Sequence, residues 1–447
     1  MKTIYSISLL LSIILLIASC SKDDRSSETS IMPNGGQLDF ARIYGGSKNE
    51  SGQSVVSTID GGYAILGHTQ SMDGDISDKL NESYDYWFLK FNSNSELQWQ
   101  KTFGGTADDF GKSLIQTQDG GYAILGSSYS NDEDVTVNNG QEDYWIAKLD
   151  ANGNITWQKS FGYSGTDSGI SLLQSNDGGY LITGILDVTS SGGEGNTRNN
   201  QALHAGGDYW AIKLNASGDL EWSKYFGGFF SDTPFGAIET EDNGYVIVGS
   251  SDSVDTDITS NIGDYDFWVI KISTTGNLEW ERSFGGTEID EARGIVQSND
   301  GNYVIVGDTR SSDVNISNSI GNADLWLIKI SPTGNLIWEK TIGGTSFDVG
   351  RSISKTQDNG FLLSGSSRSS DGDVTTNKGQ NDAWVVKVNN TGNVEWQKTI
   401  GGSNIEFANS VTELNNETVV AVGETSSNDG DIEENLGFED LLLIKIK

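Results

Sequence analysis

The sequence predicts an all-β fold, a seven-bladed β-propeller with four antiparallel strands in each blade. Three recurring features carry this prediction: a Gly-rich turn, an Asp-x-Trp-x-x-Lys segment and a second Trp-containing segment. The first residues of the turns are Asp60, Asp119, Asp177, Asp242, Asp300, Asp358 and Asn416, at spacings of 59, 58, 65, 58, 58 and 58 residues. A supersecondary unit that repeats at such a period is typical of solenoids, propellers and arrays.

Each repeat divides into four strands, as its second copy illustrates. Residues 113–118 and 122–126 flank a Gly-Gly turn in which glycine supplies the positive φ angle, and this predicts a hairpin. Residues 143–148 and 155–161 flank an Ala-Asn-Gly-Asn turn and predict a second hairpin. We therefore expect a four-stranded meander, with strands A to D in chain order.

The two ends of the chain predict how the ring closes. The seventh copy ends with a C strand at residues 441–445 and has no D strand. Residues 38–46 match the end of a D strand, and no A, B or C strand precedes them. An N-terminal strand that completes the last blade leaves no free sheet edge. We expect this 3+1 closure, and one domain over residues 38–447.

Tryptophans and apolar runs predict the contacts between blades. The fully apolar runs 303–306 and 325–328 indicate strands that are buried on both faces. The twelve tryptophans fall in strands C and D: Trp87, Trp145, Trp210, Trp268, Trp326 and Trp384, then Trp99, Trp157, Trp222, Trp280, Trp338 and Trp396. Because they recur in blade after blade, we interpret them as core; the alternative is a platform that stacks an aromatic or sugar ligand.

These Gly-Gly, Asp-x-Trp-x-x-Lys and Trp-bearing motifs resemble the β-propeller repeat family found in secreted and surface proteins of bacteria. The resemblance covers residues 38–447. It implies an extracellular binding or scaffold module and implies no reaction. The chain is similar to WD-type propellers only in strand order, since it lacks their His and Trp-Asp signatures.

The N-terminus has the length and flanks of a secretory signal peptide. Lys2 precedes an apolar stretch at residues 7–17, which Ala-Ser-Cys20 follows. Residues 16–20 resemble a bacterial lipobox, which implies cleavage after residue 19 and lipidation of Cys20. The alternative is an ordinary secretory signal with an incidental cysteine.

Residues 20–37 then form a lipidated flexible tether, because they contain too little apolar surface to pack. Residues 21–24, Ser-Lys-Asp-Asp, resemble the surface-export signal of Bacteroidota lipoproteins. This resemblance implies an outer-membrane protein that is anchored by lipid and faces the cell exterior.

The amino-acid composition of the chain disfavours several classes of binding partner. Asp and Glu number 63 and Lys and Arg 28, which gives a net charge of −35. Such a charge disfavours nucleic acid and anionic membrane surfaces. The chain has a single cysteine, so it has neither a disulfide framework nor a Cys/His zinc site. We expect a monomer that contacts the membrane only through its lipid.

An acidic residue stands four positions after the second residue of the Gly-Gly motif that follows each D strand. This set comprises Glu50, Asp109, Asp167, Asp232, Asp290, Asp348 and Glu406. A ring of such carboxylates in the D-to-A loops would bind a cation or a polyol. The alternative is that each accepts backbone N–H bonds in its own loop or pairs with the strand C lysines, which are Lys90, Lys148, Lys213, Lys271, Lys329, Lys387 and Lys445.

The B-to-C loops carry a Ser-x-Asp-x-Asp/Asn motif that can present two carboxylates to calcium, the one cofactor that the sequence suggests. The candidate ligands are Asp73, Asp75, Asp132, Asp134, Asp255, Asp257, Asp371, Asp373, Asp429 and Asp431. The motif lacks the third ligand and the glycine of an EF-hand loop. The alternative is a set of Asx turns that satisfy the loop backbone.

Blade 3 departs from the repeat. Gly184 and Asp208 are 24 positions apart, against 17 or 18 in the other blades, so its B-to-C loop holds an insertion. We expect this insertion to overhang the channel mouth and to bind ligand, unless it is a drifting loop without a role. The candidate ligand-binding residues are Glu194, Arg198 and His204, with Phe229 and Phe230 in the next D-to-A loop.

The channel itself is expected to present a polar column from the A strands. Its members are Ser57, Gln116, Gln174, Glu239, Gln297, Lys355 and Glu413.

Together these features predict a non-catalytic, surface-exposed lipoprotein that binds glycans or a surface protein. The alternative is a polysaccharide-acting hydrolase or lyase, which needs two carboxylates with separated pKa values. The repeated acids offer no such pair, and neither His68 nor His204 belongs to a recognisable Ser/His/Asp arrangement. A third hypothesis is a calcium-stiffened adhesin.

Overall fold

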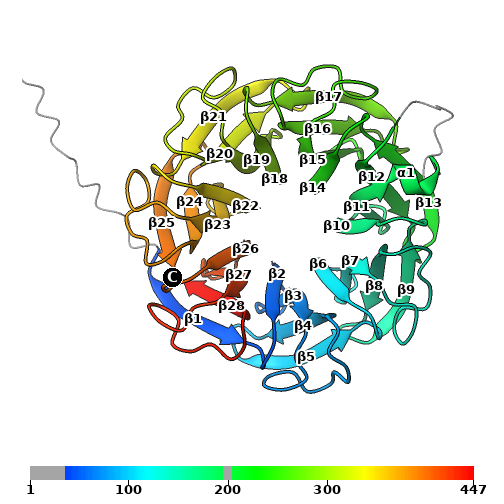
Figure 1. Ribbon diagram of the computed structural model, residues 1–447, viewed down its shortest axis with the longest axis vertical. Coiled ribbons are helices and arrows are strands. Elements are labelled where there is room, and N and C mark those ends of the chain that lie inside the picture. The colour runs from blue at the N-terminus through cyan, green and yellow to red at the C-terminus, as the bar shows by residue number, and fades with distance from the viewer. Residues whose placement is uncertain (1–35, 195–203) are drawn as a thin grey trace, which may run out of the picture.

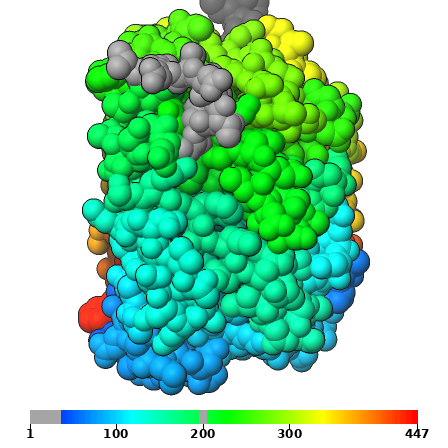
Figure 2. Space-filling model, turned by 90° about the vertical axis from the view of Figure 1, so that its right-hand side faces the viewer, coloured from blue at the N-terminus to red at the C-terminus, as the bar shows by residue number. Residues whose placement is uncertain are grey.

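Seven four-stranded antiparallel sheets stand side by side around a common axis in the computed structural model, which describes residues 36–194 and 204–447 (Figure 1). The seven-bladed propeller predicted from the repeats is therefore confirmed. Seen from the side, the teal and green blades pack into a continuous outer wall (Figure 2). Within the described residues, no helix is both long and apolar enough to cross a bilayer.

The strands occupy four concentric positions, A to D from the axis outward. The A strands are β2 (Glu50–Ser57), β6 (Asp109–Gln116), β10 (Ser168–Gln174), β14 (Asp232–Glu239), β18 (Asp290–Gln297), β22 (Asp348–Lys355) and β26 (Glu406–Glu413). The B strands are β3 (Tyr63–Thr69), β7 (Tyr122–Ser128), β11 (Tyr180–Asp187), β15 (Tyr245–Ser251), β19 (Tyr303–Thr309), β23 (Phe361–Ser367) and β27 (Val419–Thr425).

The outer two positions complete each blade. The C strands are β4 (Asp85–Phe91), β8 (Asp143–Leu149), β12 (Gly207–Leu214), β16 (Asp266–Ile272), β20 (Asp324–Ile330), β24 (Asp382–Val388) and β28 (Asp440–Ile446). The D strands are β5 (Leu97–Phe103), β9 (Ile155–Phe161), β13 (Leu220–Phe226), β17 (Leu278–Phe284), β21 (Leu336–Ile342), β25 (Val394–Ile400) and β1 (Leu38–Tyr44).

The ring closes in the seventh blade, whose strand order is β26-β27-β28-β1. Strand β1 pairs antiparallel with β28, so that Tyr44 lies opposite Leu441. The backbone groups of Gln37 and Lys447 exchange two further hydrogen bonds, of 3.0 and 2.8 Å. The N-terminal strand thus takes the D position of the last blade, and the 3+1 closure is confirmed.

The A-to-B turns explain the strand C lysines. In blade 1, Oδ1 of Asp60 accepts from the backbone N–H of Gly62 at 3.0 Å, and Nζ of Lys90 lies 2.9 Å from Oδ2 of Asp60. A Cβ atom on Gly62 would lie 2.2 Å from the carbonyl oxygen of Phe91, so only glycine fits there. The turn aspartate therefore joins two hairpins of one blade.

The same pairing recurs in five other blades. It joins Lys148 to Asp119, Lys213 to Asp177, Lys271 to Asp242, Lys329 to Asp300 and Lys387 to Asp358. The predicted alternative, in which these lysines pair with the acids before strand A, is wrong. In the register of blade 1, Lys90 lies opposite Ala64 while Glu50 lies opposite Thr69, five residues away along the strand. That separation is roughly 17 Å at 3.4 Å per residue.

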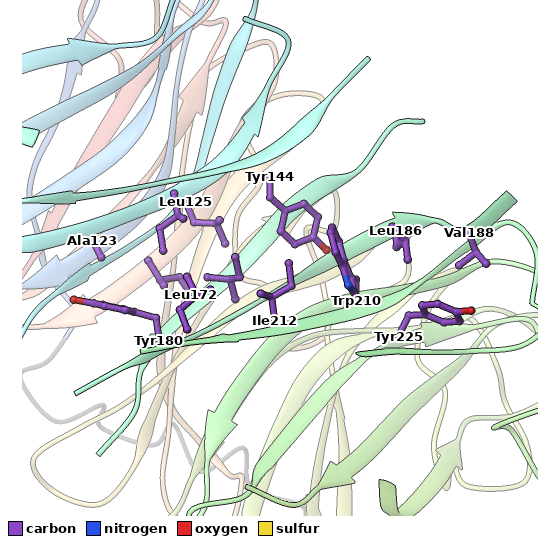
Figure 3. Close-up of a cluster of buried hydrophobic side chains, with 13 residues drawn as sticks. Ala123, Leu125, Tyr144, Leu172, Tyr180, Leu186, Val188, Trp210, Ile212 and Tyr225 are labelled. Atoms are coloured by element: carbon purple, nitrogen blue, oxygen red, sulfur yellow. The ribbon is translucent and has the colours of Figure 1, made fainter. Parts of the chain in front are cut away.

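The hydrophobic core lies between blades. Figure 3 shows the cluster between blades 2 and 3, where Tyr144 of β8 meets Trp210 of β12 edge to face, with ring centroids 4.9 Å apart. Five strand C tryptophans are fully buried, and Trp210 is 2% exposed. The strand D tryptophans lie further out. Five of their rings face a turn of the next blade, as Trp99 faces Gly153, and Trp396 faces Gly36. These positions support the interpretation of the tryptophans as packing residues.

Candidate functional site

A cavity of about 530 Å³ occupies the channel near the start of the A strands. Each of the seven A strands contributes one side chain to its wall from the same position of the repeat. These side chains are Gln53, Lys112, Ile170, Phe235, Arg293, Arg351 and Asn409. The cavity is therefore a product of the whole ring rather than of one blade.

A β-bulge places these side chains. In blade 1, Gly52 lies opposite Gly67 and Ser54 lies opposite Leu66, so that Gln53 has no partner in strand B. The same slip occurs at the matching residue of the six other A strands. A bulge leaves one residue out of the ladder and turns its side chain in a new direction. Here that direction is the channel.

The bulge position breaks the sevenfold repetition of the fold. Its occupants are two amides, three cations, an isoleucine and a phenylalanine, whereas the residue before it is always glycine, alanine or proline. A single repeat does not reveal this position. Superposition of the seven repeats would reveal it, as a variable column beside a column of small residues.

The predicted polar column lies four residues further along the A strands than the bulged position. Its residues lie at the other end of the A strands, where several bond to the preceding blade. Oε1 of Gln116 accepts from the backbone N–H of Ile59 at 2.8 Å, and Oε1 of Gln174 accepts from that of Gln118 at 2.9 Å. These side chains therefore tie blades together, and the cavity wall is formed by the bulged residues instead.

Three cations face this cavity in a strongly acidic protein. Nη2 of Arg293 lies 2.8 Å from Oε2 of Glu291, and its guanidinium carbon lies 4.3 Å from the ring centroid of Phe235. The guanidinium carbon of Arg351 lies 4.5 Å from the ring centroid of Phe407. These contacts hold the two guanidinium groups against aromatic faces at the channel wall.

Lys112 and Arg351 have no carboxylate oxygen within 4.0 Å among residues 36–194 and 204–447. Nζ of Lys112 instead approaches Oε1 of Gln53 at 3.4 Å. Both side chains reach water inside the channel, yet protein surrounds them. Their charges are therefore solvated by the channel rather than neutralised by a partner.

The three cations act on one another. Displacement of water by the surrounding protein lowers the pKa of Lys112, while the charges of Glu424 and Glu142 raise it and the charge of Arg351 lowers it. The same loss of hydration, together with the charge of Arg293, lowers the pKa of Arg351. The channel therefore holds a cluster of cations whose pKa values are lowered mainly by loss of hydration, and the repulsion between the cations is opposed by nearby carboxylates.

Acidic residues lie at the edge of and behind this cluster. Glu142 lines the cavity and accepts from the hydroxyls of Tyr129 at 2.8 Å and Ser168 at 2.6 Å. Asp308, which is 2% exposed, lies behind Arg293, with 4.0 Å between its Oδ1 and Nε of Arg293. Burial raises the pKa of Asp308 to about 6. Its Oδ1 finds no hydrogen-bond donor in the part of the chain that the structure describes.

His68 lies beside the same wall. Its ring meets Phe110 and Tyr84 edge to face, with centroids 5.2 and 5.6 Å apart. Burial lowers the pKa of His68 to about 3, so the imidazole is neutral at physiological pH. It therefore contributes an aromatic contact and no positive charge.

The seven acids predicted as a loop ring are buried, and none lines the cavity. All but Asp167 are the first residue of an A strand, and Asp167 immediately precedes one. Each accepts a backbone N–H four residues earlier, as Oε2 of Glu50 does from Gly46 at 2.8 Å. Their predicted role in satisfying the loop backbone is confirmed.

The Asp-x-Asp loops bind backbone in the same way. Oδ1 of Asp73 accepts from Ser47 N at 2.8 Å, and Oδ2 of Asp75 accepts from Gly45 N at 3.0 Å. Equivalent bonds hold Asp132, Asp134, Asp255, Asp257, Asp371, Asp373, Asp429 and Asp431. No group of three His, Cys, Asp or Glu side chains with metal-binding geometry occurs among the described residues. Calcium binding stays a prediction.

The described part of the blade 3 insertion lies at the outer rim. It begins with α1 (Val188–Ser191), which lies beside β13 in Figure 1. Val188 is buried in the core between blades 2 and 3, and Tyr225 Oη donates to the carbonyl of Gly193 at 3.3 Å. These contacts draw the loop outward, so the expectation that it overhangs the channel mouth is wrong for this part.

The structure brings some of the predicted ligand residues together at that rim. His204 Nδ1 hydrogen-bonds to Oδ2 of Asp208, and the N–H of Ala205 donates to Gly228 O, beside Phe229 and Phe230. The two phenylalanines are 47% and 52% exposed, with ring centroids 6.2 Å apart. Glu194 is exposed at the end of the described segment. Arg198 and Cys20 lie outside the described residues, and ligand binding at this rim stays a prediction.

Comparisons with known proteins add little about function. No family model matches the chain. The regulatory protein FlaEY of Caulobacter vibrioides is 26% identical over 220 residues, which are 47% of this chain and 23% of that protein, so the chain spans about a quarter of that relative's length.

Similar solved structures include Sqt1 from Chaetomium thermophilum, with 10% identity, a TM-score of 0.43 and coverage of 87% of this chain and 82% of that one. The gluconolactonase XC5397 from Xanthomonas campestris has 8% identity, a TM-score of 0.38 and coverage of 93% and 98%. A protein of unknown function from Bacteroides caccae has 11% identity, a TM-score of 0.37 and coverage of 66% and 81%. All three TM-scores are below 0.5, so no argument about function rests on these likenesses.

Proposed function

We propose that this protein is a non-catalytic binding module, anchored to the cell surface by lipid, and that it binds a glycan at the channel mouth. The observation that carries the proposal is the bulged position of the A strands. It is a position where the seven blades differ in side-chain chemistry while sharing one backbone, and its seven side chains line one cavity. Binding sites are commonly built by varying residues on a rigid scaffold in this way.

The cavity supports a glycan better than a flat protein surface. Its volume of about 530 Å³ suits a ligand of one or two sugar rings, and pockets for small ligands commonly have about 300–1,000 Å³. Phe110, Tyr129 and Phe235 supply aromatic faces, while Gln53 and Asn409 supply amide donors and acceptors. Aromatic faces with a few polar groups are what a sugar ring needs for stacking and orientation.

A glycan array on the detergent-solubilised protein, followed by calorimetry with each hit, tests the proposal. Phe235→Ala removes an aromatic face from the cavity and should weaken binding at least tenfold, with only a small change in melting temperature. Phe230→Ala, which removes an exposed phenylalanine at the blade 3 rim, is the matched control. Loss of binding in Phe230→Ala but not in Phe235→Ala would move the site to the rim and refute the channel-mouth proposal.

The alternative function, a polysaccharide-acting hydrolase or lyase, has one observation in its favour. A carboxyl group whose pKa is about 6 suits a general acid or base near neutral pH, and Asp308 is such a group next to the cavity wall. Asp308 lies behind Arg293, so substrate reaches it only if that arginine moves. Release of reducing ends or unsaturated products from polysaccharides, lost in Asp308→Asn, would favour the enzyme over the binding module.

A further inference from the structure

We infer that the ligand of the channel mouth is anionic, and that Lys112, Arg293 and Arg351 hold its carboxylate, sulfate or phosphate group. The inference rests on the ligand site proposed above and adds the charge of the ligand to it. In a chain with a net charge of −35, a cavity wall with three cations and one carboxylate, Glu142, is an exception that needs a physical reason.

Among the described residues, seven buried lysines pair with a carboxylate, whereas Lys445, which is 7% exposed, donates to Oγ of Ser95 instead. Lys90 and five other strand C lysines each lie within 3.1 Å of a turn aspartate. Lys79, which is 6% exposed, lies 3.0 Å from Asp85. Lys112 and Arg351, which are exposed to the channel, lack a carboxylate at ion-pair distance within the described residues. The missing counter-charge is what a bound anion would supply.

The cations converge from opposite sides of the ring. Lys112 comes from the A strand of blade 2, whereas Arg293 and Arg351 come from those of blades 5 and 6, which face blade 2 across the axis (Figure 1). Each charge lowers the pKa of the next across the cavity, as found for Lys112 with Arg351 and for Arg351 with Arg293. An anion between them replaces this repulsion with attraction.

The two arginines are oriented for an oxyanion. The guanidinium carbons lie over the rings of Phe235 and Phe407; Nη2 of Arg293 already donates to Oε2 of Glu291, whereas Arg351 has no carboxylate partner within the described residues. A guanidinium edge presents two parallel N–H donors that match the two oxygens of a carboxylate or sulfate. Glu142, the lining carboxylate, already accepts from Tyr129 and Ser168. An acidic saccharide fits this wall, with its charge on the cations and its ring against Phe110 or Tyr129.

Calorimetry with matched probes tests the inference. The probes are a galacturonic acid trimer, a neutral galactose trimer, and inorganic sulfate and phosphate, each at two salt concentrations. We expect the acidic trimer to bind at least tenfold more tightly than the neutral one, with an affinity that falls as salt rises. Arg351→Gln and Lys112→Gln should each weaken this binding at least tenfold.

The control is Lys355→Gln, which removes an exposed lysine from the same strand as Arg351 but away from the cavity. It should change the affinity less than twofold. Neither cavity variant should lower the melting temperature strongly, since neither side chain makes an ion pair within the described residues. A large fall would assign these residues to structure and refute the inference.

The results of these measurements distinguish an anionic ligand from a glycan site that does not depend on charge. Equal binding of both trimers, lost in Phe235→Ala but kept in Arg351→Gln, refutes the anion and keeps the glycan site. Binding of sulfate or phosphate alone, weakened in Arg351→Gln, keeps the anion and refutes the glycan. Absence of binding by every anionic probe refutes the inference.

Discussion

Gly36 lies against the indole ring of Trp396, where a Cβ atom on the glycine would stand 3.0 Å from Cδ2 of the ring. In blades 2 to 6 a glycine of the C-to-D turn fills this position. Gly153 meets Trp99, Gly218 meets Trp157, Gly276 meets Trp222, Gly334 meets Trp280 and Gly392 meets Trp338. The seventh blade has no such turn, because β28 ends the chain, and the residue that leads into β1 takes its place. Closure therefore involves this contact as well as strand pairing.

Substitution of Gly36 should weaken the closure of the propeller ring. Gly36→Val adds a branched side chain at φ +83° and against the indole, so we expect a lower melting temperature and a loss of about 1–3 kcal/mol from strain and overpacking. Gly61→Val is the matched control, because its φ is +80° and no atom lies within 4 Å of the added Cβ. Equal losses in the two variants, measured by thermal unfolding, would leave only backbone strain and no role for the contact with Trp396.

Stability should rise as the pH falls from 7.5 to about 5. Burial raises the pKa of Asp85 and Asp232 to about 7 and that of Asp109 to about 6, above the value of about 3.9 in an unfolded chain. The folded state then binds more protons than the unfolded state, so the stabilisation is fully present below about pH 4 and is lost as pH rises through 6–7. Asp232→Asn should flatten this part of the profile of melting temperature against pH.

Below about pH 4 the trend should reverse. Burial would raise the pKa of the turn aspartate Asp60, but hydrogen bonds from Thr58, Lys90 and Gly62 hold it at about 2. Such a group stabilises the fold above its unfolded pKa and loses that effect as the pH falls towards 2. A maximum of melting temperature near pH 4–5 is expected, and a profile that rises steadily to pH 8 would contradict it.

Calcium binding can be tested by the same thermal unfolding measurement. If the Asp-x-Asp loops bind calcium, 5 mM calcium at pH 7.5 should raise the melting temperature by several degrees over a chelator, because a ligand that binds only the folded state stabilises it. Asp373→Asn should reduce this shift. It gives blade 6 the acid-amide pair that blade 5 carries at Asp313 and Asn315. Identical curves with calcium and chelator would leave these aspartates as turn residues.

We predict that the protein is anchored by lipid and that this anchoring depends on Cys20. We expect the wild-type protein to enter the detergent phase of a Triton X-114 extraction and to incorporate radiolabelled palmitate. Cys20→Ser should do neither, because sulfur is the atom that the lipid would modify. Protease added to intact cells should degrade the wild-type protein if it faces the exterior. Palmitate incorporation that persists in the serine variant would place the modification elsewhere.

The fold was predictable from the sequence because the residues that determine it recur in blade after blade. Asp60, Gly62 and Lys90 build one turn whose chemistry returns along the chain, and the strand C tryptophans mark the core between blades. Strand ends were less predictable: Asp109 opens β6, four residues before the strand start expected at Ser113, because an acid that bonds loop backbone looks like a loop residue.

The site was hidden for a different reason. Nothing in one repeat shows that the strand bulges at Arg351. The bulge lies beside Gly350, which packs so closely against the neighbouring blade that a Cβ would lie 2.8 Å from Val306. Alternation of side chains along a regular strand would assign Arg351 to an ordinary ladder position. The blade 3 insertion was equally misleading, because the burial of Val188 that turns it outward is a tertiary contact.

The bulge also allows the A strand to serve ring assembly and ligand binding with different residues. The residue it expels contributes no ladder hydrogen bond and is absent from the cores between blades, so exchanging it leaves the assembly of the ring almost untouched. The ring has seven such positions, and the residue at each of them can be substituted independently of the other blades. A new specificity could thus arise by single mutations, without the loss of stability that usually accompanies a remodelled site. The same positions are where a library for engineered recognition should begin.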